Sequence, residues 1–259
     1  MSAATGKVDL EIQGSIARLT FDRASARNAM TWAMYEQLES HLERLADAKS
    51  VRATILRGSS QTFVAGTDIA LFAPFSTAQD GLIYERRLES IVARLESARM
   101  PTLAVLDGHA TGAGLIFAAV CDLRICTPNA RFGMPIARTV GNCLSIANHA
   151  RLIAVFGTAR TKAMILTAET LSAADALACG FVTEIVPPDE IDARAAQLCE
   201  RIAANAPITV AITREAVRRI THSQLPVSDD LLRLAYGSRD FHEGVAAFLA
   251  KRPPHWQGE

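Results

Sequence analysis

The sequence predicts an α/β protein in which a helical region follows a strand-rich core. Segments with the apolar pattern of strands alternate with segments of helical spacing through about residue 135, which is typical of layered α/β proteins. Beyond that point the spacing is helical almost throughout. Apolar residues make up 49% of the chain and charged residues 21%, so a large core can form. We therefore expect a core over residues 1–195 and a helical region over residues 196–259.

The first unit is expected to be strand, strand and helix. The segment "VDLEIQGSIARLTF" alternates apolar and polar residues on both sides of Gln13-Gly14-Ser15, which predicts a β-hairpin with one face on the core. Thr31 is placed to cap a helix that runs from residue 32 to about residue 46. The apolar stripe of this helix consists of Met34, Leu38, Leu42 and Leu45.

Strands and helices then alternate along the chain. Apolar runs predict strands at residues 51–58, 62–66, 102–108 and 121–127. Helices are predicted at residues 82–97, with a stripe of Leu88, Ile91, Val92 and Leu95, and at residues 112–120. A loose recurrence of strand, strand and helix at roughly forty to fifty residues indicates an internal repeat.

The last third is expected to be mainly helical. Ser172 is placed to cap a short helix that ends at Gly180, and residues 181–186 have the pattern of a strand before Pro187-Pro188 interrupts the chain. Helices are then predicted over residues 191–205, 208–221 and 227–250. This region has too few strands to form a second sheet domain.

The composition argues against several classes of function. The chain has 27 basic and 27 acidic residues, so its formal net charge is zero and a nucleic-acid partner is not expected. The five cysteines lie far apart without a C-x-x-C pair, which argues against a disulfide framework or a metal site and favours a reducing cytoplasm. We recognise neither a signal-peptide pattern nor an apolar run of about eighteen residues, so we expect no membrane span.

Two segments place small residues where a predicted strand ends. They are "FVAGTDI" at residues 63–69 and "DGHATGAGL" at residues 107–115. In the second, Gly112-Ala113-Gly114 opens a helix whose first N–H groups have no partner within the helix. These donors and the positive end of the helix dipole can bind an oxyanion. The alternative is a tight turn in which the glycines only satisfy the backbone geometry.

The first segment strengthens the oxyanion interpretation. The main-chain N–H of Thr67 follows Ala65-Gly66 and is placed to point at the same oxygen, giving two donors to one developing charge. Neither segment is a dinucleotide fingerprint or a P-loop, because G-x-G-x-x-G and G-K-[ST] are both absent.

Over nearly its whole length the chain resembles the enoyl-CoA hydratase/isomerase family, the crotonases. The resemblance lies in "ARNAM", "FVAGTDI", "DGHATGAG", "CDLRI", "FGMP", "TAETLSAADALACGFVTEIV" and "FHEGVAAFLAKRPPHW". It implies a spiral of repeated ββα units with a helical C-terminal region that serves oligomerisation and closure of the CoA site. It also implies a homotrimer or a dimer of trimers.

The implied ligand is an acyl-CoA thioester, so coenzyme A is part of the substrate and no separate cofactor is expected. The resemblance places the thioester carbonyl between the N–H groups of Thr67 and Ala113. It implies a CoA site formed by Ala26, Arg27, Ala65, Gly66, Asp68, Ile69, Ala70, Gly112 and Lys251. Lys251 matches a lysine that can reach a CoA phosphate, including across a subunit boundary.

The chain departs from the hydratases of this family at both catalytic acids. One acid is expected two residues after the last glycine of the oxyanion helix, where this chain has Ile116. The other is expected after the proline of "FGMP", where it has Ile136. Acid–base groups typically supply about 10²–10⁴ in rate and one oxyanion donor about 10²–10³. We therefore expect ordinary hydratase activity to be weak.

Several other residues are candidates to replace the two acids. Arg138 is suited either to a substrate carboxylate or to an ion pair within the protein. His109 is suited either to proton transfer or to a structural hydrogen bond. Further candidates, each with a structural alternative, are Cys143, the pair Ser145 and His149, and the acids Asp68, Asp107 and Asp122.

The leading prediction is therefore an acyl-CoA-processing enzyme that stabilises a thioester enolate in an oxyanion hole. One alternative is another crotonase chemistry, namely isomerisation, decarboxylation or C–C hydrolysis, which needs the enolate but not the two glutamates. The second alternative is an acyl-CoA-binding protein without catalysis, which follows from Ile116 and Ile136 alone.

Overall fold

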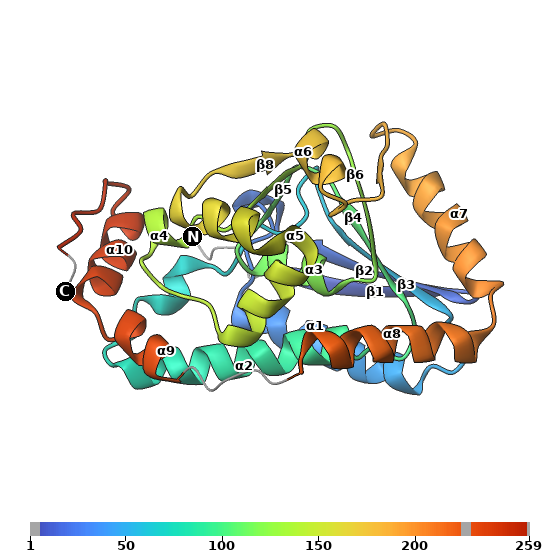
Figure 1. The fold of residues 1–259 in the computed structure, drawn as a ribbon, viewed down its shortest axis with the longest axis horizontal. Coiled ribbons are helices and arrows are strands. Elements are labelled where there is room, and N and C mark those ends of the chain that lie inside the picture. Colours follow the sequence, from blue (N-terminus) through green and yellow to red (C-terminus); the bar gives the residue numbers. More distant parts are fainter. Residues whose placement is uncertain (1–5, 224–228, 258–259) are drawn as a thin grey trace.

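The fold consists of two β-sheets flanked by helices, as a computed structural model describes for residues 6–223 and 229–257 (Figure 1). The larger sheet has the strand order β1-β2-β3-β4-β6-β9 and the smaller sheet the order β5-β7-β8. The strands of the larger sheet are β1 Lys7–Gln13, β2 Ile16–Asp22, β3 Ala53–Gly58, β4 Thr102–Leu106, β6 Leu123–Cys126 and β9 Glu184–Ile185. Those of the smaller sheet are β5 His109–Thr111, β7 Arg131–Gly133 and β8 Thr170–Ser172. The predicted α/β class is confirmed.

Both sheets arise from a repeated path of the chain. β1 and β2 form the predicted antiparallel hairpin, and β2, β3, β4, β6 and β9 are then successive parallel neighbours. After β4 and after β6 the chain crosses to the smaller sheet, where β5 and β7 pair in parallel. After β3 it does the same more briefly, because Val64 makes a parallel bridge to Ala110 of β5. The predicted repeat of strand, strand and helix is confirmed.

Helices follow the strands and cover the sheets (Figure 1). They are α1 Trp32–Asp47, α2 Ala78–Glu96, α3 Ala113–Val120, α4 Ile136–Thr139, α5 Ile146–Leu166, α6 Ala173–Ala178, α7 Ile191–Ala203, α8 Pro207–Thr221, α9 Asp229–Tyr236 and α10 Arg239–Leu249. The 3₁₀ helices are η1 Ala24–Ala26 and η2 Ile69–Phe72.

The larger sheet is buried on both faces. Leu56 of β3 belongs to the main core, which also contains residues of α1, α2 and α3, whereas Ile55 belongs to a second cluster beside α7. Ala195 and Cys199 of α7 complete this second cluster. Residue 195, where we expected the core to end, thus lies inside a helix packed on the sheet, and the division into two parts stays a prediction.

Capping residues set several helix boundaries. Thr31 caps α1 as predicted, since its side chain accepts a hydrogen bond from the N–H of Met34. Ser172 starts α6 as predicted, in a capping box with Asp175. A further capping box begins at Thr77, so α2 starts at residue 78 rather than at the predicted residue 82.

Three further predicted elements are wrong in extent. Residues 62–66 form only the bridge at Val64, because the next N–H group, that of Ala65, bonds to Arg27 and leaves the ladder. The strand predicted at residues 181–186 is reduced to β9, whose register with β6 covers two residue pairs.

The third is the helix predicted over residues 227–250, which is two helices. Residues 227 and 228 lie outside the described residues. α9 ends at Tyr236, and Ser238 then caps α10 by accepting a hydrogen bond of 3.0 Å from the N–H of Phe241. A serine hydroxyl at this point competes with the helix for the main-chain donors, so a new helix begins.

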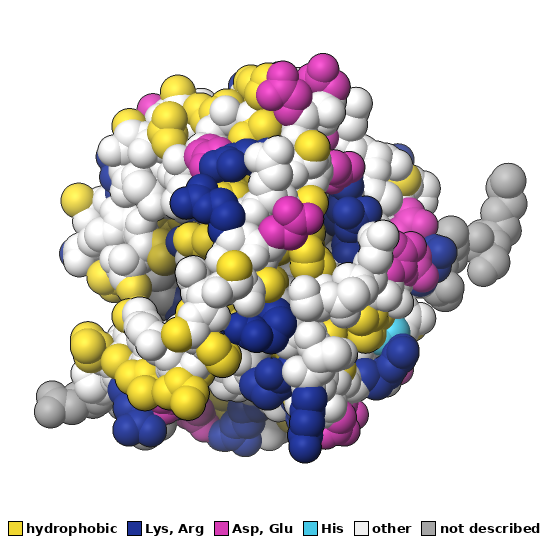
Figure 2. Space-filling model, turned by 90° about the vertical axis from the view of Figure 1, so that its right-hand side faces the viewer, with side chains coloured by type: hydrophobic (Ala, Val, Ile, Leu, Met, Phe, Trp, Pro, Cys, Tyr) yellow, Lys and Arg dark blue, Asp and Glu magenta, His cyan; other side chains and the backbone are white. Residues whose placement is uncertain are grey.

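The surface bears both signs of charge. On the end of the molecule that carries α7 and α8, basic, acidic and hydrophobic side chains all occur (Figure 2). Within the described ranges, no helix combines the length and the apolar character needed to cross a membrane.

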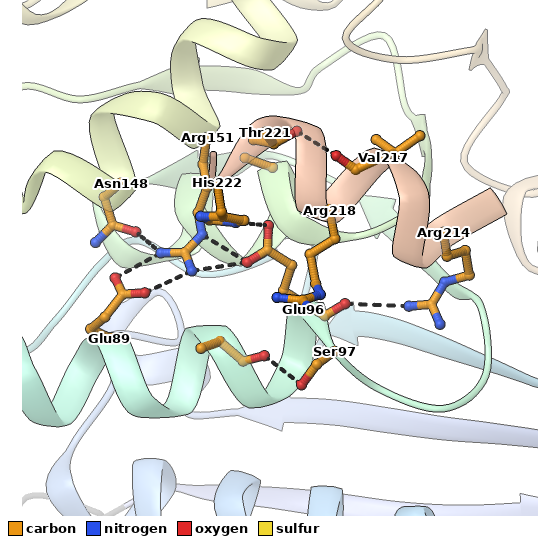
Figure 3. Close-up of polar contacts among 12 residues, drawn as sticks. Glu89, Glu96, Ser97, Asn148, Arg151, Arg214, Val217, Arg218, Thr221 and His222 are labelled. Carbon is orange, nitrogen blue, oxygen red and sulfur yellow. Dashed lines mark hydrogen bonds and ion pairs between the residues drawn. The ribbon is translucent and has the colours of Figure 1, made fainter. Parts of the chain in front are cut away.

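A buried arginine joins three helices of the framework (Figure 3). Arg151 of α5 has a side chain only 2% exposed, and its guanidinium bonds Glu89 at 2.7 Å and Glu96 at 2.9 Å, both from α2. It also donates to Asn148 at 2.8 Å. His222, directly after α8, has its Nε2 2.8 Å from Oε1, the other carboxylate oxygen of Glu96. Charge-assisted bonds therefore hold α2, α5 and α8 together.

Replacing Arg151 by methionine is expected to lower the free energy of unfolding by about 3 kcal/mol, because it leaves the Glu89 and Glu96 carboxylates without their cation. Urea denaturation measures the loss. Arg94→Met is the matched control, since Arg94 pairs with Glu43 at an exposed site and its loss should cost less than about 1 kcal/mol. Equal losses for the two variants would contradict the assigned role of the cluster.

Candidate active site

A cavity of about 770 Å³ brings together most of the predicted site residues. Thr67, Ala113, Ile116, Ile136 and His109 line it. It is also lined by the predicted CoA-site residues Ala26, Arg27, Ala65, Gly66, Asp68, Ile69, Gly112 and Lys251. The structure does not place Arg138 or Ala70 in this lining, and Arg138 lies exposed on α4.

The main chain around Thr67 is held on one side by Met30. The N–H of Met30 donates to the carbonyl of Gly66 at 2.8 Å, and the N–H of Asp68 donates to the carbonyl of Met30 at 2.9 Å. Because successive peptide groups of an extended chain point in opposite directions, the N–H of Thr67 is directed away from Met30.

The Thr67 side chain is held as well. Its hydroxyl lies 2.7 Å from the hydroxyl of Tyr35 and 2.7 Å from that of Tyr84. Burial raises the pKa of both phenols, so they remain neutral partners at physiological pH. These bonds anchor the residue without using its N–H.

The second N–H group opens α3. Ala113 is the first residue of this helix, so its N–H has no partner within the helix. Gly112, with φ 55° and ψ −126°, turns the chain into the helix in a conformation that L side chains rarely adopt. Among the described residues, no protein acceptor takes a hydrogen bond from the N–H of Thr67 or of Ala113.

Glycines allow the two segments to touch. Gly66 has φ 110°, and a Cβ placed there would lie 3.9 Å from the nitrogen of Ala113. A Cβ at Gly114 would lie 2.0 Å from the carbonyl oxygen of Val64, so only glycine permits this approach. The same carbonyl accepts the N–H of Thr111 at 3.1 Å. Both candidate donors are therefore held at one wall of the cavity.

Comparison with known proteins agrees with this geometry. Residues 11–259 match the sequence model of the family described as enoyl-CoA hydratase/isomerase.

The chain belongs to this family, the crotonases.

Its relatives include the 2,3-dehydroadipyl-CoA hydratase of Escherichia coli (strain K12), 31% identical over 250 residues that cover 95% of this chain and 96% of the relative. A solved methylmalonyl-CoA decarboxylase in complex with 2-nitronate-propionyl-CoA has a TM-score of 0.89 at 26% identity, covering 99% of this chain and all of that one. An enoyl-CoA hydratase/carnithine racemase from Magnetospirillum magneticum has a TM-score of 0.79 at 28% identity, with 98% of each chain covered. The expected crotonase fold is confirmed.

In this crotonase, isoleucine side chains occupy the two positions where the catalytic acids were expected. Ile116 lies in α3 and is 1% exposed, and Ile136 begins α4 and is half-buried. Both line the cavity, together with Leu88 and Leu144. The cavity wall is thus apolar at these residues, and an apolar wall strengthens electrostatic interactions inside the cavity.

A carboxylic acid that the sequence analysis missed lines the same cavity. Glu85 of α2 is 3% exposed. Its Oε1 accepts a hydrogen bond of 2.6 Å from the hydroxyl of Tyr236, and its Oε2 has no hydrogen-bond partner among the described residues. Burial raises the pKa of Glu85 to about 7.

A signal for Glu85 was present in the sequence. It lies three residues before Leu88 and seven before Val92, which places an acid on the apolar stripe of α2. Such a position predicts burial of the carboxyl group, but not what it faces.

The other candidate groups differ from Glu85. His109 makes no ring hydrogen bond with the described residues, and burial, followed by the charges of Arg27 and Arg131, lowers its pKa. Its imidazole is therefore neutral at pH 7. Burial raises the pKa of the Cys143 thiol to about 12, so this thiol is not a nucleophilic thiolate.

The remaining candidates have structural partners. The Ser145 hydroxyl caps α5 by accepting the N–H of Asn148, and His149 bonds the main-chain carbonyl of Ser145 instead of its hydroxyl. The carboxylates of three aspartates are also engaged, by Arg23 for Asp68, by Thr127 for Asp107 and by Thr102 and Arg214 for Asp122.

Glu85→Gln is expected to change how stability depends on pH. The folded-state pKa of about 7 exceeds the ordinary value of 4.5, so the contribution of Glu85 to stability is full below about pH 4.5 and is lost as the pH rises through about 7. Relative to the variant, the native protein should lose about 3 kcal/mol over this range. Urea denaturation at a series of pH values measures the difference. Parallel curves would show that Glu85 does not titrate as described.

Proposed function

We propose that this crotonase processes acyl-CoA thioesters by stabilising a thioester enolate with the N–H groups of Thr67 and Ala113. The observation that supports this is the presence of two unpaired main-chain donors at one wall of the cavity, each preceded by a glycine of positive φ. When a bond at the α-carbon breaks, its electron pair moves into the carbonyl and charge develops on the thioester oxygen. Fixed donors stabilise that charge without reorganising.

Basic side chains at the cavity support binding of the CoA part. Arg23, Arg27 and Lys251 all line it. Asp68 partly neutralises Arg23, to which it is bonded at 2.7 Å. Phe248 and Lys251 come from the end of α10 and from the residues after it, so the C-terminal segment of the same chain reaches the site. We propose that these cations bind the CoA phosphates.

The apolar wall favours a reaction that does not need the two glutamates. Hydration requires an acid–base pair to handle water and the α-carbon, and Ile116 and Ile136 occupy the places of that pair. In decarboxylation, by contrast, the C–C electron pair moves directly into the thioester as carbon dioxide leaves. The similarity in fold to methylmalonyl-CoA decarboxylase favours this as the second candidate. Isomerisation and C–C hydrolysis stay open, as does acyl-CoA binding without catalysis.

We also propose that the protein works in the cytoplasm as a homotrimer or a dimer of trimers. The C-terminal helices expose large apolar side chains, each more than 60% exposed in the single chain: Ile208, Ile212 and Ile220 of α8 and Leu234 of α9. Such side chains outside a protein interior favour association.

Light scattering after size exclusion should give three or six times the chain mass of 27.9 kDa. Ile212→Arg places a charge among these apolar side chains and should lower the mass. A wild-type monomer would refute the proposed assembly.

Ala113→Pro tests the oxyanion proposal. Proline is well tolerated at the first position of a helix, so the variant should fold while one donor N–H is lost. Turnover of a panel of acyl-CoA esters, including crotonyl-CoA, by mass spectrometry should fall by about 10²–10³. Ala113→Ser keeps the N–H and is the matched control. Unchanged turnover by the proline variant would remove Ala113 from the mechanism, and rapid hydration of crotonyl-CoA by the native protein would count against the non-hydratase candidates.

A further inference from the structure

We infer that Glu85 is the catalytic acid–base residue of this site, and that its Oε2 takes a proton from the substrate α-carbon and returns one. This inference rests on the proposed enolate mechanism and adds the group that moves the proton. It assigns to α2 the chemistry that Ile116 and Ile136 cannot perform.

The position of Glu85 fits this role. Glu85 lines the cavity that also holds the two candidate oxyanion donors. The preceding residue, Tyr84, also lines the cavity and bonds the Thr67 hydroxyl at 2.7 Å, so the wall with Glu85 adjoins the wall with the first donor. Leu88, one turn further along α2, and Leu144 line the cavity as well. Glu85 thus belongs to an apolar part of the cavity lining, with its Oε2 buried.

Only one of the two carboxylate oxygens of Glu85 has a hydrogen-bond partner among the described residues. Tyr236 fixes Oε1 at 2.6 Å and is itself contacted by Asn142, whose amide nitrogen lies 3.3 Å from the phenol oxygen. These are positioning residues, and they leave Oε2 without a protein partner among the described residues. A buried polar atom without a partner is costly and calls for a functional explanation.

Two other carboxylates of α2 show the structural alternative. Glu89 and Glu96 lie on the same side of this helix and are both bonded to Arg151 (Figure 3). Glu85 has no such cation, and an apolar residue would fill its place at lower cost. A purely structural role therefore does not account for the acid at this position.

The groups that face Glu85 leave it able to change charge near neutral pH. Burial raises its pKa to about 7. The hydrogen bond from Tyr236 and the nearby main-chain N–H of Ser145, which makes no bond to Oε2, act in the opposite direction, and the charge of Glu89 raises the pKa further. Tyr236 and Tyr84 stay neutral because burial raises the pKa of each phenol, as it does for the Cys143 thiol. An acid–base group with a pKa near the working pH is the most effective one.

Two further groups complete the surroundings. Tyr35 contacts Tyr84 through the Thr67 hydroxyl and is neutral, since burial raises its pKa as well. His109 lines the cavity, and burial, followed by the charges of Arg27 and Arg131, lowers its pKa and so favours the neutral imidazole.

The proposed step is balanced without any further reagent. The Cα–H bond of the thioester breaks, its electron pair moves toward the carbonyl to form the enolate, and the proton passes to Oε2 of ionised Glu85. The two main-chain N–H groups hold the enolate oxygen. In D₂O the proton on Glu85 is replaced by a solvent deuteron before it is returned. Delivery of that deuteron to the same carbon gives exchange, and delivery of a proton to another carbon of a conjugated enolate gives isomerisation.

Hydrogen exchange at the α-carbon tests this step directly. The native protein is incubated with acetyl-CoA, butyryl-CoA or 3-butenoyl-CoA in D₂O, and deuterium in the acyl group is measured by mass spectrometry. Glu85→Gln keeps the shape and the bond to Tyr236 but accepts no proton, so exchange should fall by about 10²–10⁴. Glu96→Gln, a matched change on α2 away from the cavity, should exchange within a few fold of the native rate.

Tyr236→Phe tests the role of Glu85 through the pH dependence of the exchange rate, which would not change if Glu85 had only a structural role. Loss of the phenol removes a bond that favours ionised Glu85, so the rise of the exchange rate with pH should shift to higher pH. Glu96→Gln should leave this midpoint in place. Should Glu85→Gln fail to fold, as judged by circular dichroism, the Tyr236→Phe profile still decides the assignment.

The outcomes separate the two proposals. Exchange by Glu85→Gln at the native rate, or an unmoved midpoint in Tyr236→Phe, would overturn the role of Glu85 and leave the enolate mechanism intact. Absence of exchange by the native protein with every probe would overturn both.

Discussion

The candidate site depends on the close contact between two main-chain segments, residues 63–67 and residues 109–114. Val64 receives the N–H of Thr111 and donates to the carbonyl of His109, while Gly114 removes the Cβ that would collide with Val64. This contact connects the first turn of the spiral with the second and brings the start of α3 beside Gly66. Main-chain hydrogen bonds and the lack of a Cβ at Gly114 make most of this contact, and the Thr111 hydroxyl adds one bond of 3.1 Å to the carbonyl of Ala65.

Because the proposed donors belong to the main chain, the side chains of the cavity wall can differ from those expected of a hydratase. The donors are peptide groups, so replacement of acids by Ile116 and Ile136 leaves them in place. The proposed enolate chemistry needs these donors but not the two missing acids, and the proposed proton transfer comes from another element, α2. The main chain thus holds the two proposed donors, and the proposed reaction depends on the side chains that the surrounding helices add to the cavity.

Helix α2 contributes two kinds of carboxylate from one face. Glu85 lies in the cavity wall with one oxygen unpaired, while Glu89 and Glu96 are bonded to Arg151 and hold α5 and α8. Their spacing of four and seven residues places all three glutamates on one side of α2. Glu89 and Glu96 therefore bind Arg151, while Glu85 supplies an ionisable group to the cavity wall. The different surroundings of chemically identical side chains, rather than their identity, give them different roles.

The sequence by itself determined the local features of this protein. Alternation around Gly14 predicted the hairpin, and Thr31 and Ser172 predicted helix starts. The two glycine segments predicted the pair of donors, which stays a prediction, although among the described residues neither N–H group has a protein acceptor. The sequence also showed, without a structure, that Ile116 and Ile136 replace the two expected acids. Only the tertiary structure revealed the three-residue strands of the smaller sheet, which are too short for a periodic pattern and exist because neighbouring turns of the spiral pair. Glu85 is the clearest case: its stripe position predicted burial, but Tyr236, 151 residues away, fixes one oxygen, and distant elements remove water from the other. The apolar periodicity of α2 predicts that one face of the helix is buried. The pKa of Glu85, however, depends on which groups surround its carboxyl group, and long-range packing determines these groups.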